Sequence, residues 1–214
     1  MFSELTDELK ATNTKLVAVS KTQSNEAITD LYNSGQRIFG ENRVQEMIPK
    51  QEALPKDIEW HQIGHLQTNK VKAIAPFVAM IHSVDSMRLL LEINKEAAKN
   101  NRKINVLLQF HIASEDSKYG MNYRKCRELL EDNRFATLDH VNICGVMGMA
   151  TYTEDDTLIR SEFRDLKKIF EKLKRDYFHD NEQFTEISMG MSSDYKIALN
   201  EGSTMVRIGS LLFA

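Results

Sequence analysis

The stretch KLVAVSKT, residues 15–22, places four residues that favour burial almost directly before a lysine. Leu16 to Val19 form a short apolar run of the kind found in buried strands, and Lys21 stands two residues after its end. A strand that has simply reached solvent would explain the charge, because most lysines are solvated surface residues. The alternative is a functional amine held at the tip of a strand, and the pattern of the remaining chain bears on that choice.

Similar apolar runs recur along the chain and alternate with longer amphipathic stretches. The apolar runs predict strands at 16–20, 37–39, 58–63, 78–81, 104–110, 141–146, 184–188 and 204–208. The amphipathic stretches predict helices near 3–12, 25–34, 42–52, 66–75, 86–99, 122–131, 157–177 and 193–200. Asn25 and either Asp85 or Ser86 are of the residue types that cap helix starts, and Gly35 is suited to ending the helix that Asn25 begins.

Strict alternation of strands and helices, with strands that are apolar throughout, predicts a parallel sheet covered by helices. Eight such strands favour a closed (β/α)8 barrel, a TIM barrel, formed by residues 1–214 as one domain. No helix is predicted after the last strand, and the helix near 3–12 is placed to cover that gap. An open doubly wound sheet is the alternative architecture.

The composition of the 214 residues excludes several classes of function. The net charge is −3 and no basic stripe is present, so we expect no nucleic-acid partner. No apolar stretch approaches the ~20 residues of a membrane span, and we expect no membrane partner. Cys126 and Cys144 have neither metal nor redox spacing, which favours reduced thiols in a cytoplasmic protein. The histidines lack carboxylate partners at metal-ligand spacing, so no metal site is predicted.

Polar residues recur where the predicted strands end. The set comprises Lys21, Glu41, Asn42, His61, His82, Ser83, His111, Ser188 and Arg207. In parallel barrels the chemistry gathers at the carboxyl ends of the strands, which favours the functional reading of the lysine. An amine in a half-dry pocket at such an end is suited to imine formation with a carbonyl compound.

The C-terminal stretch has the pattern of an anion site. Ser192, Ser193 and Asp194 stand at a predicted helix start, where backbone N–H groups attract phosphate. Gly209 and Ser210 follow the last strand and offer further N–H groups. Phosphate sites after strands seven and eight are frequent in this barrel type, although ordinary caps and turns would give the same residues.

Seven motifs occur in an order that resembles a known family. They are VAVSKT, FGENRVQE, WHQIGHLQTNK, SKYGM, GVMGMAT, EISMGMSSDYKIAL and GSTMVRIGS. Together they resemble the pyridoxal phosphate homeostasis proteins, a group similar to the N-terminal domain of alanine racemase. The resemblance extends from Leu16 to Phe213 and implies a single (β/α)8 barrel of the fold-type III class that binds pyridoxal 5′-phosphate.

The resemblance also implies roles for individual residues. Lys21 matches the lysine that holds pyridoxal phosphate as an imine, Arg207 matches the arginine facing the pyridine nitrogen, and Asn42 matches a residue near the cofactor ring. The positions that match the family's phosphate-binding residues are Ser192, Gly209 and Ser210.

The family is thought to buffer the cofactor and deliver it to apo pyridoxal-phosphate enzymes, without established turnover, and we expect a monomer. Two alternatives use the same lysine: an amino-acid racemase with the same cofactor, and an aldolase that forms an imine without any cofactor. The chain ends directly after its last predicted strand. We therefore expect it to lack the C-terminal β-domain that helps to complete the active site of alanine racemases.

Overall fold

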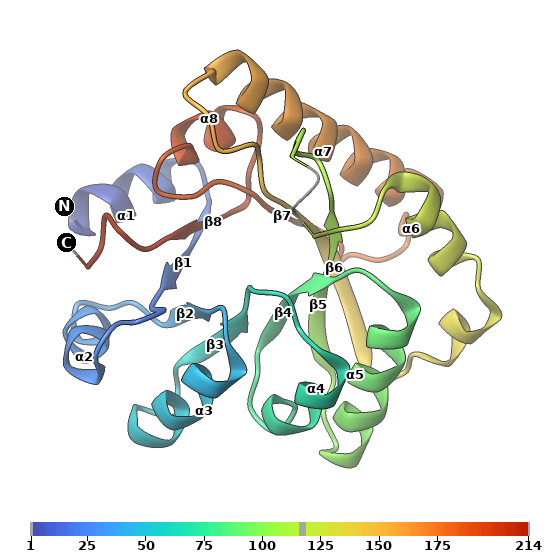
Figure 1. The fold of residues 1–214 in the computed structure, drawn as a ribbon, viewed down its shortest axis with the longest axis horizontal. Coiled ribbons are helices and arrows are strands. Elements are labelled where there is room, and N and C mark those ends of the chain that lie inside the picture. The colour runs from blue at the N-terminus through green and yellow to red at the C-terminus, as the bar shows by residue number, and fades with distance from the viewer. Residues whose placement is uncertain (1, 116–118, 214) are drawn as a thin grey trace.

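The computed structural model describes residues 2–115 and 119–213, which include eight parallel strands closed into a barrel (Figure 1). Each strand pairs with its neighbours in sequence, and the last pairs with the first. The strands are β1 (Lys15–Val19), β2 (Ile38–Glu41), β3 (Glu59–Gln62), β4 (Met80–Val84), β5 (Ile104–Phe110), β6 (Val141–Gly148), β7 (Glu186–Ser188) and β8 (Met205–Ile208). The (β/α)8 barrel predicted from the sequence is confirmed.

The helices surround the strands on the outside of the barrel (Figure 1). They are α1 (Phe2–Ala11), α2 (Asn25–Asn33), α3 (Val44–Ala53), α4 (Thr68–Ile74), α5 (Met87–Lys99), α6 (Tyr123–Leu130), α7 (Asp156–Asp176) and α8 (Tyr195–Asn200). A 3-10 helix at Asn133–Thr137 was not predicted. The cap of α2 is also corrected, because Ser24, and not Asn25, accepts a hydrogen bond from the Ala27 N–H.

Pairing between β1 and β8 closes the barrel and rules out the open sheet. Leu16 aligns with Val206, and Ala18 aligns with Ile208. Helix α1 packs over this seam, where its buried Leu5 contributes to one apolar cluster with residues of both strands. The N-terminal helix thus occupies the place that a helix after β8 would fill, as the sequence predicted.

Two apolar layers hold the barrel together. The larger lies between the strands and the helices, and α7 contributes Phe163, Leu166 and Leu173 to it, all three fully buried. The smaller layer lies in the barrel interior. It contains Val17 of β1, Leu107 of β5 and apolar residues of other strands. Burial of apolar area on this scale is the main favourable term in folding, so the strands form a rigid base for the loops at their ends.

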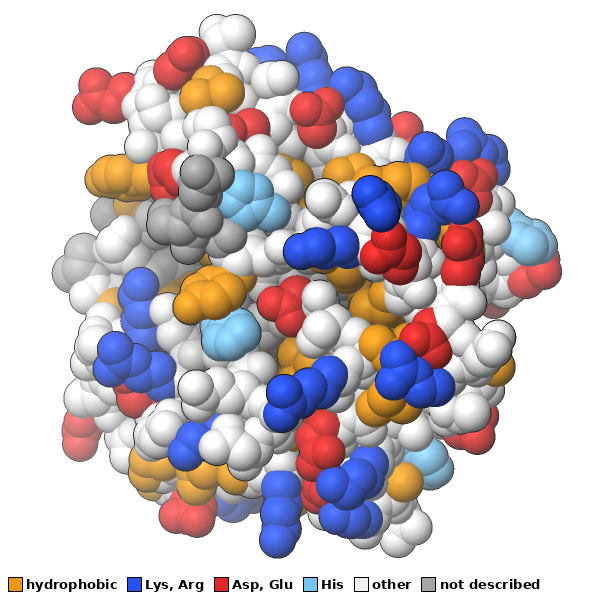
Figure 2. All heavy atoms as spheres, turned by 45° about the vertical axis from the view of Figure 1, so that its right-hand side comes forward, with side chains coloured by type: hydrophobic (Ala, Val, Ile, Leu, Met, Phe, Trp, Pro, Cys, Tyr) orange, Lys and Arg blue, Asp and Glu red, His pale blue; other side chains and the backbone are white. Residues whose placement is uncertain are grey.

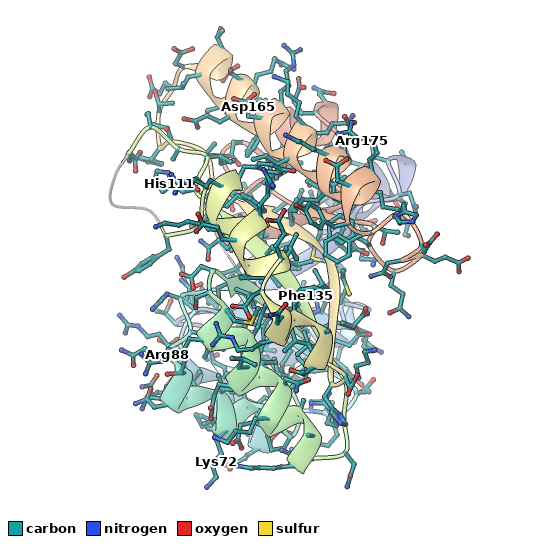
Figure 3. All side chains as sticks on the ribbon, turned by 90° about the vertical axis from the view of Figure 1, so that its right-hand side faces the viewer. Lys72, Arg88, His111, Phe135, Asp165 and Arg175 are labelled. Atoms are coloured by element: carbon teal, nitrogen blue, oxygen red, sulfur yellow. The ribbon has the colours of Figure 1, made fainter. Side chains whose placement is uncertain are left out.

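All strands run in one direction, so their carboxyl ends share one face of the barrel. Figure 3 shows Arg88, in the first turn of α5, and His111, directly after β5, on the same side of the molecule. Arg175, in the last turn of α7, lies toward the opposite side. The carboxyl ends of the strands and the loops that follow them are therefore gathered on one face.

The outer surface carries charges of both signs. Basic and acidic side chains are interspersed over the face shown in Figure 2, as the small net charge of −3 leads one to expect. Among residues 2–115 and 119–213, none of the helices combines the length and apolar character needed to cross a bilayer.

Candidate functional site

A pocket of about 630 Å³ opens at the carboxyl ends of the strands. It contains every residue that the sequence singled out for cofactor binding, namely Lys21, Asn42, Ser192, Arg207, Gly209 and Ser210. Ser193, which the sequence placed in the predicted anion site, also lines it, and the lining residues to which the sequence gave no role in binding are Val19, Ile63, Met149, Tyr152, Met191 and Leu211. A volume of this size is typical of sites for small organic ligands.

A second hollow, of about 510 Å³, lies elsewhere on the barrel. It is lined by Lys103 and Val141, which stand at the amino ends of β5 and β6. Conserved chemistry in (β/α)8 barrels is found at the opposite, carboxyl-terminal face. The pocket at the strand ends is therefore the candidate site.

Lys21 stands in a tight turn just beyond β1. The Gln23 N–H donates to the Ser20 carbonyl at 3.0 Å, which closes the turn. Thr22 has a positive φ of +63°, a conformation that is unusual for a β-branched residue. The lysine side chain lines the pocket but is exposed, whereas the sequence predicted half-dry surroundings for it.

Asn42 is held at the rim by the neighbouring loop. Its carbonyl oxygen accepts a hydrogen bond from Gln62 Nε2 at 3.0 Å. Gly64 packs against the same backbone so closely that a Cβ there would lie 2.4 Å from the Asn42 oxygen. The glycine in the WHQIGH stretch therefore lets the loops after β2 and β3 meet, and any larger residue would displace Asn42.

The predicted anion-binding residues meet on the far side of the pocket. Gly190, with a φ of +97°, turns the chain out of β7 toward Ser192. The Gly209 N–H donates to Ser192 Oγ at 3.3 Å, whereas the sequence predicted that this N–H would be free. Helix α8 starts at Tyr195, two residues later than predicted, and has only six residues. The hydroxyl-bearing residues Ser192, Ser193 and Ser210 line the pocket here, and the short α8 offers no long helix dipole.

Arg207 supplies a buried cation at the pocket floor. Only 4% of the residue is exposed. Its Nη1 donates to Ser188 Oγ at 2.6 Å, and its Nη2 donates to the Gly148 carbonyl at 3.0 Å. Burial lowers the pKa of Arg207 to about 10, so the guanidinium remains charged at neutral pH. A guanidinium has only donors, so its remaining N–H groups favour an acceptor atom in the pocket.

A chain of hydrogen bonds continues from Arg207 across the barrel interior. Ser188 Oγ lies 3.1 Å from His82 Nδ1, and His82 Nε2 lies 3.0 Å from His61 Nδ1. The guanidinium donates to Ser188 Oγ, so the hydroxyl proton is free to be donated to His82 Nδ1. His82 then carries its proton on Nε2 and donates it to His61 Nδ1. Both imidazoles are then neutral, with their protons on Nε2. The sequence offered no signal for this pairing, since each histidine is uninformative alone.

Burial keeps the two imidazoles uncharged. It lowers the pKa of His61 to about 3, helped by the charge of Lys15, and it lowers the pKa of His82 well below its ordinary value. His61 and the Arg207 charge add to the effect at His82. Among the described residues, no group of three histidine, cysteine, aspartate or glutamate side chains is arranged to hold a metal ion.

The paired histidines predict a loss of stability in mild acid. A histidine that stays neutral in the fold is protonated below pH ~6.5 in the unfolded chain, so its contribution is present above that pH and lost as the pH falls. We expect the free energy of unfolding, from urea titrations, to drop by about 2 kcal/mol per buried imidazole between pH 7 and pH 5. In His61→Gln about half of the drop should remain. The control His179→Gln, at an exposed position, should show the same drop as wild type. A drop in His61→Gln as large as that of wild type would refute the assignment of the pH dependence to the buried histidines.

Comparison with known proteins places the chain in a family. The alanine racemase N-terminal domain family model matches residues 2–214. The chain is 43% identical over 200 residues to the pyridoxal phosphate homeostasis protein of Aquifex aeolicus, covering 93% of this chain and 86% of that protein. It is 35% identical over 202 residues to the protein of the same name from Escherichia coli, covering 92% and 84% of the two chains.

Solved structures agree with the sequence comparison. PipY of Synechococcus elongatus, in a structure with PLP bound, matches with a TM-score of 0.86 and 33% identity over 100% of both chains. An alanine racemase of Clostridium difficile matches with a TM-score of 0.72 and 14% identity over 96% of this chain and 53% of the racemase, which is a likeness of fold alone. On the strength of the matched relatives, this chain belongs to the family of pyridoxal phosphate homeostasis proteins.

Proposed function

We propose that this chain binds pyridoxal 5′-phosphate in the pocket at the strand ends, buffers it and delivers it to other proteins. The observation that carries the proposal is the meeting in one pocket of an amine, a buried guanidinium and several hydroxyl groups. The names of the relatives and the PLP-bound state of PipY support it.

The residues of the pocket fit the chemical groups of this cofactor. Lys21 is the one lysine that lines the described pocket, and its amine would bond covalently to the aldehyde carbon that the cofactor supplies. Arg207 would donate to the ring nitrogen, and Asn42 would lie near the ring. Ser192, Gly209 and Ser210 would donate to the phosphate once the Gly209 N–H leaves Ser192 Oγ.

The charge of Arg207 favours storage of the cofactor over turnover. Pyridoxal phosphate withdraws electrons best when its ring nitrogen is protonated, and a cationic neighbour disfavours that proton. An arginine that donates to the nitrogen would therefore hold the ring without strengthening it as an electron sink. This argument supports a carrier, which we propose acts as a monomer toward apo enzymes that need the cofactor.

The cysteines support a reducing, cytoplasmic compartment for this activity. Cys126 and Cys144 are both free and buried. Burial raises the pKa of Cys126 to about 12 and that of Cys144 to about 11. Thiolates are the reactive form of cysteine, so both residues act as inert members of the core.

The proposal predicts that the protein is yellow and that the colour depends on Lys21. Borohydride reduction followed by peptide mapping should place a stable pyridoxyl adduct on Lys21. Lys21→Ala should lose the adduct and the absorption, because no other lysine lines the described pocket. Lys125→Ala, which removes an exposed lysine of α6 outside the pocket, serves as the matched control. A colourless protein that still reacts through Lys21 with a sugar phosphate would favour the cofactor-free aldolase.

A second prediction concerns the phosphate. Charge-assisted hydrogen bonds contribute about 1.5–3 kcal/mol each, so two of them strengthen binding by about 150-fold or more. Spectral titration should therefore show that unphosphorylated pyridoxal binds at least about 100-fold more weakly than pyridoxal phosphate. Ser192→Ala and Ser210→Ala should each weaken the phosphorylated compound by about tenfold and leave pyridoxal unchanged. Equal affinity for the two compounds would remove the anion site from the proposal.

A further inference from the structure

The motif FGENRVQE, residues 39–46, contains charged residues that do not line the pocket. Only Asn42 of this stretch lines the pocket. Glu41 is completely buried, and Glu46 is half-buried on α3. Lys50, on the next turn of α3, is only 8% exposed. Two carboxylates and an ammonium thus lie partly or wholly inside the protein, next to the turn that carries Lys21.

Lys50 and Glu41 hold the peptide group before Lys21. Lys50 Nζ donates to the Ser20 carbonyl at 2.7 Å and to Glu41 Oε1 at 2.7 Å. Ser20 Oγ donates to the same carboxylate oxygen at 2.6 Å, and the Ser20 N–H donates to the Gly40 carbonyl at 3.0 Å. The carbonyl that Lys50 binds belongs to the peptide bond between Ser20 and Lys21.

Glu46 holds the peptide group after Lys21. The Thr22 N–H donates to Glu46 Oε2 at 3.1 Å, and this N–H belongs to the peptide bond between Lys21 and Thr22. Glu46 and Lys50 are four residues apart and therefore lie on the same face of α3. One helix face thus grips both peptide groups that flank Lys21, in a turn where Thr22 has a positive φ.

A role in stability alone explains this arrangement poorly. Replacing a buried ion pair by apolar residues of similar size is often neutral or even stabilising. Burial raises the pKa of Glu41, while hydrogen bonds from Lys50 and Ser20 oppose that rise. Within the described part of the chain, Glu41 Oε2 has no hydrogen-bond partner. Burying Glu41 and Lys50 is therefore costly, and what the pair provides is a fixed position for the peptide group before Lys21.

We propose that Glu41, Glu46 and Lys50 are positioning residues that clamp the turn after β1 and so direct the Lys21 amine into the pocket. The inference rests on the proposed function, because it assigns these residues to the reaction of Lys21 with pyridoxal phosphate. The Lys21 side chain is exposed, so packing does not orient it. Its direction is set by the backbone, and the clamp fixes that backbone from both sides.

Glu46 offers the sharper test, because it lies near the surface and its loss should leave the fold intact. Glu46→Ala removes the acceptor for the Thr22 N–H, whereas Glu46→Gln retains an acceptor oxygen. Glu52→Ala removes an exposed glutamate from the same helix and serves as the control. Two quantities are measured: hydrogen exchange of the Thr22 amide in cofactor-free protein, and the rate at which added pyridoxal phosphate forms a borohydride-trappable adduct on Lys21.

The clamp predicts that Glu46→Ala changes both quantities together. Exchange at Thr22 should accelerate at least tenfold, and adduct formation should slow about tenfold, while Glu46→Gln and Glu52→Ala stay within twofold of wild type. Wild-type protein that forms no adduct at Lys21 overturns the proposed function. A normal wild-type rate that Glu46→Ala leaves unchanged overturns the clamp alone, whether or not Thr22 exchange accelerates.

A double variant tests the buried half of the clamp. Glu41→Leu combined with Lys50→Met removes both charges together, so neither is left buried without its partner. We expect a thermal midpoint close to that of wild type and adduct formation at Lys21 slowed by about tenfold. A folded double variant that forms the adduct at the wild-type rate would show that Glu41 and Lys50 do not position Lys21.

Discussion

The pairing of β1 with β8 is the interaction on which the rest of the structure depends. Leu16 to Ala18 align with Val206 to Ile208, and this register brings Lys21 and Arg207 from opposite ends of the chain into one pocket. Pairing β1 with β8 closes a loop that contains most of the chain, and the entropy cost of closing a loop grows only slowly with its length. Burial of apolar side chains at the seam under α1 offsets that cost. Without closure, the amine and the guanidinium would stand on opposite edges of an open sheet.

Two buried polar networks occupy the barrel beneath the pocket and beside it. One runs from Arg207 through Ser188 to the paired His82 and His61. The other joins Lys50 and Glu41 to the turn that carries Lys21. In a low-dielectric interior a polar group without a partner is costly, so such networks permit few arrangements. The first network ends at Arg207, which lines the pocket, and the second ends at the Ser20 carbonyl, in the peptide group that precedes Lys21.

The fold by itself does not determine the chemistry. The alanine racemase of Clostridium difficile has a similar barrel although its sequence differs widely from this one. A shared barrel supports different reactions because function resides in the loops at the strand ends. In this chain those loops present an exposed amine, a cationic donor and hydroxyl groups, which suits the holding of an aldehyde phosphate.

The sequence by itself determined the strand and helix alternation, and from it the barrel, because hydrophobic periodicity is a local property of the chain. Its motifs, through their resemblance to a known family, also identified six residues that line a single pocket. Only the tertiary structure decided which side chains meet. The contact of His61 with His82, and that of Glu46 with the Thr22 N–H, join separate segments of the chain. Such contacts depend on strand register and helix placement, and a single sequence contains no local signal for either.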